Sequence, residues 1–352
     1  MRLHSRKDQR LLCTACHKTL AATKGTAFSR LRTAAETVSL IVTLLAHGGP
    51  LQAMVAACGV DERTVAAWWR RAGRQGQAVQ EPLVEHPRDL GPGQAEDRRL
   101  KKQGGIVWLA LAMRVTTRWW LAGEVREPRD MLVIRRLSER VRACALHRPL
   151  LCCPEGLCSA LRAMRETCRD PVRTGAPGRP RLRPGRKSCL AQVVKREAPR
   201  GGVAVERRMV DGPPARVETL RRRAQGDGVI NPASRERRHA TLRERLASLT
   251  RRGRARARRT LTLQHGRSLI GTVSHCCTPH ARLAHAGRGT TPAMAAGLTD
   301  HGWPVRALLS FHVPPPCWTP PTQRGRSSHA LKRLMKRWCG DHGSLWSYRG
   351  AT

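Results

Sequence analysis

The spacing of apolar residues predicts a helical region over residues 33–76. This region contains the run TVSLIVTLLAHGG and then LQAMVAACGVDERTVAAWWRRAG at 51–73. With Gly59 as a turn, the apolar positions on either side of it fall on the shared face of two short helices that cross steeply. Asp61 stands where it can cap the second helix. The apolar positions are Met54, Cys58, Val60, Val65 and Trp68.

From residue 94 to about 285, strand-forming and helix-forming segments alternate. The run IVWLALAMRV is apolar throughout, as expected of a central strand covered on both faces. Three meandering strands, a helix, and a strand parallel to the first and beside it form the α/β order of ribonuclease-H-like domains. The expected elements are strands at 94–101, 106–115 and 116–125, a helix at about 128–147, and a strand at 149–156.

These patterns divide the chain into five parts. A small all-α helix-turn-helix domain is expected to precede the α/β domain, with a polar, Pro- and Gly-containing linker between them. The segment before the helices has little periodicity, and the segment after the α/β domain is Pro-rich and basic. The expected parts are 1–30, 31–76 for the helix-turn-helix, 77–93 for the linker, 94–285 for the α/β domain, and 286–352 for the tail.

Charge narrows the choice of partner. The 352 residues include 66 Lys and Arg against 25 Asp and Glu, a formal net charge of +41. Such a chain attracts polyanions, so we expect it to bind nucleic acid. No apolar run reaches the length of a membrane-spanning helix, and the start of the chain lacks the apolar core of a signal peptide, so we expect no membrane partner and a cytoplasmic location. In that reducing compartment the thirteen cysteines are expected to be free, buried or metal-bound.

The second helix of the predicted helix-turn-helix carries the candidate DNA contacts. Arg63, Thr64, Arg70 and Arg71 are expected to face outward, toward base edges and phosphates. An ordinary helical hairpin with solvated arginines is the alternative. Arg179 lies in PGRPRLRPGRK, which is either an arm for the DNA minor groove or a solvated basic loop.

Cys13 and Cys16 form a Cys-x-x-Cys pair. Two thiolates at this spacing can grip one tetrahedral Zn²⁺, but a closed site needs four ligands and no second pair lies nearby. The pair is therefore either part of a zinc site or two free thiols.

Acidic residues form the candidate catalytic group. Acids near residues 96 and 155 would meet, because the first and fourth strands are expected to be neighbours. In GVINPASRERRHATLRERL, Asn231 and Pro232 mark a helix start, and Glu236 shares a helical face with Arg243. A helix that adds a third carboxylate to two strand ends can hold a pair of Mg²⁺ or Mn²⁺ ions, which stabilise the attacking and leaving oxygens of a phosphodiester. The alternative is a surface ion pair between Glu236 and Arg243.

Several stretches resemble bacterial insertion-sequence transposases of the DDE type. They are ATKGTAFSRLRTAAETV (22–38), PLQAMVAACGVDERTVAAW (50–68), VWLALAMRVTTRWWLAGEV (107–125), DPVRTGAPGRPRL (170–182), the 231–243 helix and TPAMAAGLTDHGW (291–303). The resemblance implies a zinc ribbon and a helix-turn-helix before a ribonuclease-H-like catalytic domain. It also implies terminal inverted repeats and target DNA as substrates, and self-association on DNA. Arg243 is a further candidate DNA contact.

The resemblance assigns the metal-binding acids. Glu96 matches the first aspartate of the family and Asp97 the glutamate that follows it. Glu155 matches the second aspartate, and Glu236 matches the third acid unchanged. Residues 1–30 match only part of a zinc ribbon, so we interpret the chain as a truncated and eroded copy.

Glutamates at 96 and 155, where the family has aspartates, leave open whether the chain is catalytically active. One added methylene displaces a carboxylate, whereas Mg²⁺ demands near-octahedral geometry. Asp97 is one residue away in a strand and therefore on the opposite face. The chain is either a DNA transposase or a catalytically dead DNA-binding relic of one, and a basic RNA-binding or ribosomal-type protein is a third interpretation.

Overall fold

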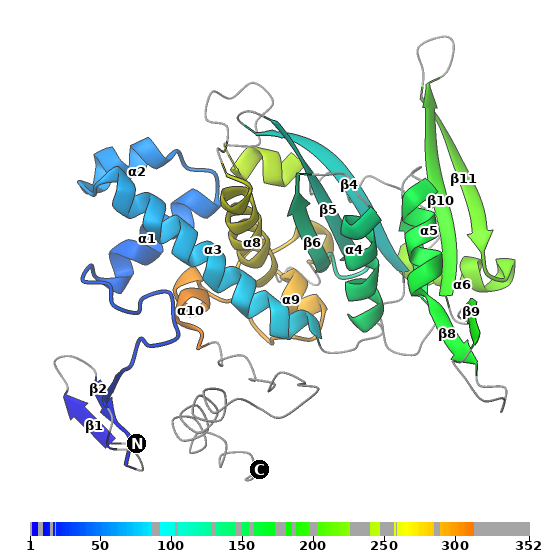
Figure 1. The fold of residues 1–352 in the computed structure, drawn as a ribbon. Coiled ribbons are helices and arrows are strands. Elements are labelled where there is room, and N and C mark those ends of the chain that lie inside the picture. Colours follow the sequence, from blue (N-terminus) through cyan, green and yellow to red (C-terminus); the bar gives the residue numbers. More distant parts are fainter. Residues whose placement is uncertain are drawn as a thin grey trace, which may run out of the picture. The chain divides into compact units, whose positions relative to one another are not determined.

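A computed structural model describes most of the chain, and its Cα atoms form two compact units (Figure 1). One unit comprises Met1–Arg32 with Ser310–Thr352, and the other comprises Thr33–Leu309. The described residues are 2–5, 10–14, 17, 19–85, 92–102, 105–127, 131–144, 150–154, 158–172, 181–184, 188–197, 203–225, 240–246, 257, 259–284 and 289–312.

The first unit contains a small antiparallel sheet in the order β1-β2-β3. Its strands are β1 (Arg2–Ser5), β2 (Arg10–Leu12) and β3 (Thr19–Ala21). Phe28 is buried after the sheet, and its backbone N–H donates to Thr26 Oγ1 at 3.1 Å. His312 Nδ1 lies 3.0 Å from the carbonyl oxygen of Lys24, so both described parts of this unit are in contact.

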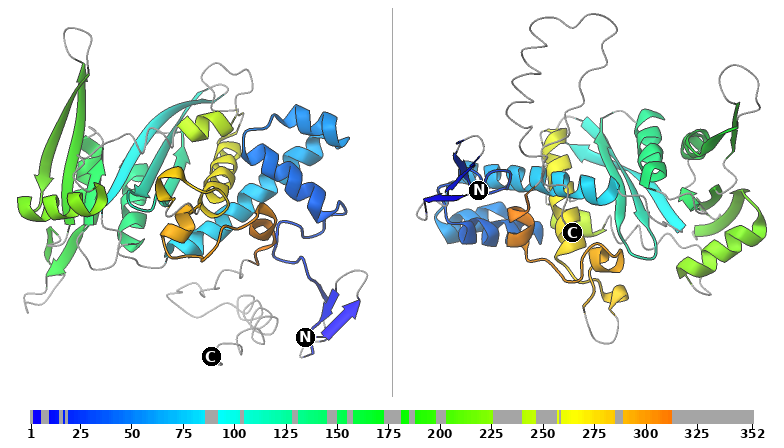
Figure 2. Two further views of the ribbon diagram at one scale, coloured as in Figure 1. Left: turned by 180° about the vertical axis from the view of Figure 1, so that it is seen from behind. Right: turned by 90° about the horizontal axis from the view of Figure 1, so that it is seen from below.

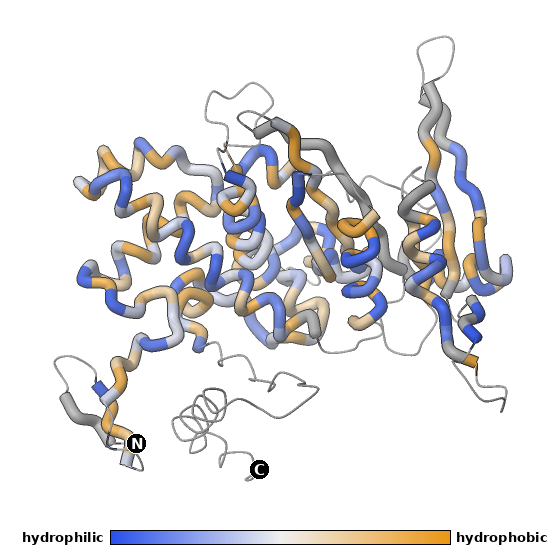
Figure 3. The backbone as a smooth tube through the Cα atoms, in the orientation of Figure 1, coloured by the Kyte–Doolittle hydropathy of each residue, from blue (hydrophilic) through white to orange (hydrophobic). Residues whose placement is uncertain are grey.

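Three helices open the second unit: α1 (Ala35–Ala46), α2 (Leu51–Cys58) and α3 (Glu62–Glu85). Both α1 and α2 contact α3, and hydrophilic and hydrophobic residues alternate along all three helices (Figure 3). The buried side chains recur every three or four residues, as a helix with one core-facing stripe requires. They include Val38, Ile41, Val42 and Leu45 of α1, Met54 of α2, and Val65, Trp68, Ala72 and Val79 of α3.

Helix α3 is longer than the sequence pattern predicted. The predicted linker over 77–93 is wrong at both ends, because α3 continues to Glu85 and β4 begins at Pro92. The polar residues of this stretch resemble a linker in the sequence. In the structure Gln80 is buried, since α3 packs along α8 (Thr260–Cys276).

A six-stranded mixed sheet in the order β11-β10-β7-β4-β5-β6 forms the centre of the second unit. β4, β5 and β6 are antiparallel neighbours, β7 is parallel to β4, β10 is parallel to β7, and β11 is antiparallel to β10. The sheet thus contains a three-stranded meander and a strand that is parallel to the first strand and beside it, and the ribonuclease-H-like class stays a prediction. The strands are β4 (Pro92–Lys102), β5 (Gly105–Arg114), β6 (Trp120–Arg126), β7 (Leu150–Pro154), β10 (Ser188–Glu197) and β11 (Val203–Asp211).

The two faces of the sheet carry separate cores. Alternate side chains of β5 divide between them: Ala110 and Ala112 join one cluster, and Leu109, Leu111 and Met113 join the other. The first face, which we call the α4 face, is covered by α4 (Met131–Cys144) and α5 (Cys158–Thr167). The second, the α8 face, is covered by α8 and by the helical residues 240–245.

Helix α8 lies between α3 and strand β6, and the two views of Figure 2 agree on this arrangement. Glycines allow the helices to approach closely. A Cβ atom at Gly73 would lie 2.6 Å from both Cβ and the carbonyl oxygen of His265, and one at Gly76 would lie 3.1 Å from Thr272 Oγ1. The hydroxyl of Thr272 donates to the carbonyl oxygen of Gly76 at 3.1 Å. Small residues therefore set the distance between α3 and α8.

The segment predicted to be an irregular tail from residue 286 contains folded elements. Helices α9 (Pro292–Ala295) and α10 (Val305–Ser310) bury Ala293, Leu308 and Leu309. The backbone N–H of Trp303 donates to the carbonyl oxygen of Cys276 at 2.8 Å, next to the end of α8. The tail prediction is wrong for 292–310, where few apolar residues make long-range contacts that local periodicity does not reveal.

The remaining elements extend the second unit beyond the sheet. A two-stranded antiparallel ribbon is formed by β8 (Arg169–Val172) and β9 (Arg181–Pro184). Helix α6 (Pro214–Gln225) covers β7 and β10 with Val217 and Leu220, and a short 3₁₀ helix, η2, spans Ala281–Leu283.

Candidate functional site

The α2–α3 turn has the geometry that the sequence predicted. Gly59 ends α2 with φ 62° and ψ 24°, a left-handed conformation that favours glycine, and its N–H donates to the carbonyl oxygen of Val55 at 3.0 Å. Asp61 Oδ2 accepts from the backbone N–H of Thr64 at 3.2 Å, which confirms the predicted cap. A short glycine turn between two packed helices is the arrangement of DNA-binding helix-turn-helix motifs.

Replacing Asp61 with alanine should lower the free energy of unfolding by about 1 kcal/mol, because the first turn of α3 loses its side-chain acceptor. Denaturant unfolding of the full chain measures this loss. Asp61→Asn keeps an acceptor and is the control, expected to remain within a few tenths of a kcal/mol of the unaltered chain. Equal losses in both variants would show that the cap contributes nothing.

Three exposed arginines form a stripe along α3. Arg63, Arg70 and Arg74 are spaced by seven and four residues and so share one helical face over roughly 16 Å. Arg70 Nε donates to the carbonyl oxygen of Ala66 at 3.2 Å, and none of the three has a carboxylate within ion-pair distance in the described part of the chain. We call Arg63, Arg70 and Arg74 the α3 arginine stripe. It offers cationic groups that a phosphate backbone can bind.

Thr64 and Arg71 do not belong to this stripe. Both were expected to face outward, but both are half-buried. Residues 64, 68, 71 and 75 follow one side of the helix, and Trp68 and Gln75 on that side are buried. These two residues are therefore less accessible than the expectation that they face outward implied.

Arg74 is a candidate contact that the sequence analysis missed. Its separation of four residues from Arg70 and eleven from Arg63 is the available signal. The sequence analysis considered the helix-turn-helix stretch only over 51–73, which ends one residue before Arg74. The structure shows instead that α3 continues for eleven residues beyond Arg74.

Two of the four predicted catalytic positions lie in β4. Glu96 pairs with Leu111 of β5, and Asp97 pairs with Ala110. Ala95 of β4 pairs with Pro154 of β7. These two residues directly precede the predicted acids Glu96 and Glu155. Glu155 and Glu236 themselves lie outside the described residues, as do Arg179 and Cys16.

The strand register separates Glu96 from Asp97. Leu111 belongs to the α8-face cluster, where it packs with Leu242 and Leu246 from the helical segment that follows Glu236 in the chain. Ala110 belongs to the α4-face cluster. Paired residues of an antiparallel ladder occupy the same face, so Glu96 holds an α8-face position and Asp97 an α4-face position.

The pairing of β7 with β4 also assigns residues of β7 to the two faces of the sheet. Cys153 pairs with Gln94, which in turn pairs with Met113 of the α8-face cluster. Glu155 follows Cys153 by two residues in the sequence and lies beyond the end of β7. The helical segment 240–245 adds Arg243, which is half-buried, and Arg245, whose Nη1 donates to Ser274 Oγ at 3.3 Å.

The zinc prediction stays a prediction. Cys13 is half-buried in the connection between β2 and β3, where the backbone N–H of His17 donates to its carbonyl oxygen at 2.9 Å. His17 has a φ of 51°, so the chain turns sharply after the Cys pair. Over the described residues, no group of three or more His, Cys, Asp or Glu side chains is placed to hold a metal ion.

The cluster near His275 has a core role. His275 is fully buried, accepts from the backbone N–H of Trp120 at 3.3 Å through Nε2, and packs against the rings of Trp119 and Trp120. Burial raises the pKa of Cys276 and that of Cys277 to about 12, which keeps both as thiols at neutral pH. His275 thus holds β6 against α8, and Cys276 is part of the α4-face core.

Comparisons with known proteins add no family. No protein-family model matches the chain, and no curated protein is similar to it. No helix in the described stretches has both the length and the apolar character needed to cross a membrane.

Proposed function

We propose that this protein is a DNA-binding transposase of the two-metal, phosphodiester-transferring class, with α3 as the helix that contacts DNA. The net charge of +41, the capped glycine turn before α3 and the α3 arginine stripe support DNA as the partner. The proposal includes a cytoplasmic, nucleoid-associated location, where that partner is found.

The observation that carries the catalytic part of the proposal is the register of β4. This register gives Glu96 a position on the α8 face. Leu242 and Leu246, which follow Glu236 in the sequence, pack on the same face. Ala95, the neighbour of Glu96, pairs with Pro154, the residue before Glu155. On this proposal, the three acids that are far apart in the sequence would meet at this side of the sheet, because Glu155 directly follows β7 and Glu236 precedes the 240–246 segment in the chain.

These residues fit the requirements of Mg²⁺ or Mn²⁺. Glu96, Glu155 and Glu236 would supply carboxylate oxygens, the ligands that these ions prefer, and ions so held lower the cost of charge on the attacking and leaving oxygens of a phosphodiester. The proposal leaves Asp97 out of this group, because its register partner Ala110 belongs to the α4-face cluster. The α3 arginine stripe would bind phosphates and hold the duplex while the reacting bond is positioned.

Nicking of supercoiled plasmid DNA in Mn²⁺ tests the catalytic assignment. Glu96→Gln should reduce the nicking rate by about 100-fold, because even outer-shell partners of metal sites contribute roughly 10–100-fold. Asp97→Asn is the matched control, adjacent in the strand, and should stay within about twofold of the unaltered chain, since its position faces the other core. A large loss in Asp97→Asn with a small loss in Glu96→Gln would overturn the assignment.

A DNA-binding relic without catalysis is the second candidate function. It is favoured by glutamates at 96 and 155, where the transposases that the chain resembles have aspartates. The double variant Glu96→Asp with Glu155→Asp distinguishes the two. Nicking by the unaltered chain supports the enzyme, whereas DNA binding without nicking in both proteins supports the relic.

A further inference from the structure

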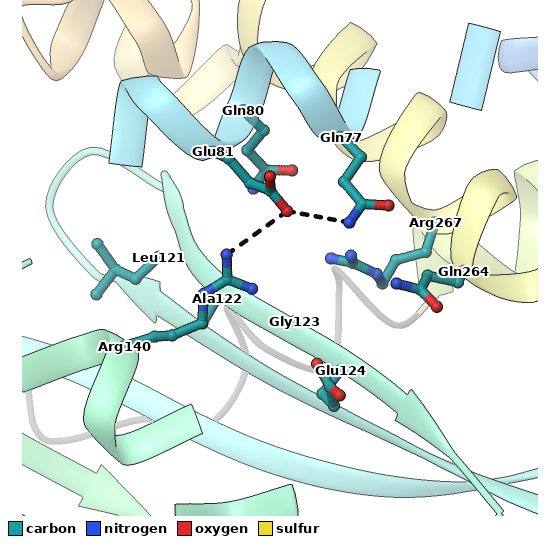
Figure 4. Close-up of a pocket in the computed structure, with 10 residues that line it drawn as sticks. All are labelled: Gln77, Gln80, Glu81, Leu121, Ala122, Gly123, Glu124, Arg140, Gln264 and Arg267. Atoms are coloured by element: carbon teal, nitrogen blue, oxygen red, sulfur yellow. Dashed lines mark hydrogen bonds and ion pairs between the residues drawn. The ribbon is translucent and has the colours of Figure 1, made fainter. Parts of the chain in front are cut away.

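A small polar pocket lies where α3, β6, α4 and α8 meet (Figure 4). Its volume is about 80 Å³, well below the roughly 300–1,000 Å³ of pockets that hold drug-sized ligands, so only a small group fits. β6 is the outer strand of the sheet in the described part of the chain, and its residues 121–124 form one wall. Polar side chains form the rest: Gln77, Gln80, Glu81, Arg140, Gln264 and Arg267.

Arg267 is the unusual member of this group. It is 6% exposed, and it is the only Lys, Arg, Asp or Glu in α8. Its guanidinium lies against Gly123 of β6, where a Cβ atom would overlap Nη1. Nη2 donates to Ser268 Oγ at 3.3 Å, and the buried Nε has no hydrogen-bond partner in the described structure. A guanidinium has five N–H donors, so this buried cation has donors left over.

Two carboxylates, Glu81 and Glu124, line the pocket with Arg267, but neither forms an ion pair with it. Glu81 accepts from Gln77 Nε2 at 3.0 Å and lies 3.8 Å from Arg140. Glu124 lies 3.8 Å from Arg136 of α4. Both carboxylates therefore have a guanidinium partner, whereas no carboxylate lies within ion-pair distance of Arg267 among the described residues.

The protonation state of Arg267 follows from its surroundings. Burial lowers the pKa of Arg267 to about 10, an effect that Glu124 and Glu81 oppose and Arg140 reinforces. The group remains cationic at neutral pH. A buried cation with unused donors and no directly paired carboxylate is costly unless an anion is supplied.

We propose that this pocket binds one phosphate-type oxyanion on Arg267, with the amides of Gln77 and Gln264 and the guanidinium of Arg140 on its walls. The oxyanion is either a free one or a backbone phosphate of DNA bound along α3. The second source rests on the proposed DNA-binding function. It is geometrically direct, because Gln77 and Glu81 continue the helical face of Arg70 and Arg74 at spacings of three and four residues.

Inorganic phosphate tests the site on the full chain. Phosphate, compared with chloride at equal ionic strength, should raise the midpoint of thermal unfolding, because a ligand that binds only the folded state stabilises it. Arg267→Gln should abolish the shift. Arg282→Gln removes an exposed arginine outside the pocket and should keep it. No phosphate-specific shift in the unaltered chain, or an equal shift in Arg267→Gln, would overturn the site.

A second variant tests the site independently, in case Arg267→Gln fails to fold. Gln77→Leu with Gln264→Leu keeps the buried guanidinium and removes two amide donors, so phosphate affinity should fall by about tenfold, as expected for the loss of roughly 1.4 kcal/mol of hydrogen bonding. Unchanged affinity in this double variant would also count against the site.

The salt dependence of DNA affinity distinguishes the two possible sources of the oxyanion. If a backbone phosphate occupies the pocket, the slope of log K against log[salt] should fall by about one in Arg267→Gln. An unchanged slope together with a phosphate-induced shift identifies a free oxyanion. Failure of the DNA-binding proposal would appear separately, as DNA binding that does not depend on Arg63, Arg70 and Arg74.

Discussion

Replacement of Arg63, Arg70 and Arg74 together by glutamine should weaken binding to duplex DNA by on the order of 100- to 1,000-fold at low salt. Each charge-assisted contact contributes about 1–1.5 kcal/mol, and each 1.4 kcal/mol changes an affinity tenfold. The slope of log K against log[salt] should fall by roughly 2.7, because each neutralised phosphate contributes about 0.9. Fluorescence anisotropy with a labelled duplex at several salt concentrations measures both quantities.

A matched triple variant separates this site from general charge. Arg223, Arg259 and Arg282 are exposed and lie on other elements of the second unit, so their replacement by glutamine removes the same charge elsewhere. Affinity should then fall only a few-fold. Both triple variants should unfold within about 0.5 kcal/mol of the unaltered chain, because the residues are at the surface. Equal loss of affinity in the two variants would mean that DNA binds diffusely and that α3 is not the contact helix.

The strand order was predictable because strands are marked by local composition. The apolar run around Leu109 was expected at 106–115 and forms β5 at Gly105–Arg114, buried on both faces as its pattern requires. The parallel neighbour β7 was likewise expected at 149–156 and spans Leu150–Pro154. The third strand was expected from residue 116, but residues 115–117 form a turn and β6 begins at Trp120.

The course of α3 and α8 was not predictable in the same way. Residues 77–85 were expected to form part of a linker, yet they continue α3, and Gly73 and Gly76 just before them approach α8 closely. Hydrophobic periodicity cannot show such packing, because small residues act by letting backbones approach and not by burying large apolar surfaces. Tertiary contact decided the structure of this segment.

For the candidate site too, the sequence alone does not give the tertiary contacts. The sequence marks Glu96 and Asp97 as adjacent acids but cannot say which of them shares a face with the 240–246 segment. That depends on the pairing of Glu96 with Leu111 and on the packing of Leu242 against that side of the sheet. The pocket at Arg267 gave one sequence signal, a single charged residue in an otherwise uncharged buried helix.

The α3–α8 crossing should be the most sensitive point for stability. A Cβ atom at Gly73 would lie 2.6 Å from Cβ and the backbone oxygen of His265, and backbone atoms cannot rotate away as the end of a flexible side chain can. Gly73→Leu should therefore force the helices apart and lower the free energy of unfolding by about 3 kcal/mol or more, at the upper end of the cost of overpacking. The higher helix propensity of leucine offsets less than about 1 kcal/mol of this loss.

Two further variants of α3 should lose less stability than Gly73→Leu, and they serve as its comparisons. Ala67→Leu adds a side chain on the exposed side of α3 and should change stability by less than about 0.5 kcal/mol. Gly76→Ala should cost an intermediate amount, since its Cβ would meet Thr272 Oγ1 at 3.1 Å, a contact that a small shift of the hydroxyl can relieve. Denaturant unfolding at constant temperature measures all three. If Gly73→Leu proves no more destabilising than Ala67→Leu, then α3 does not pack on α8 at this distance, and the pocket at Arg267, which both helices line, loses its basis as well.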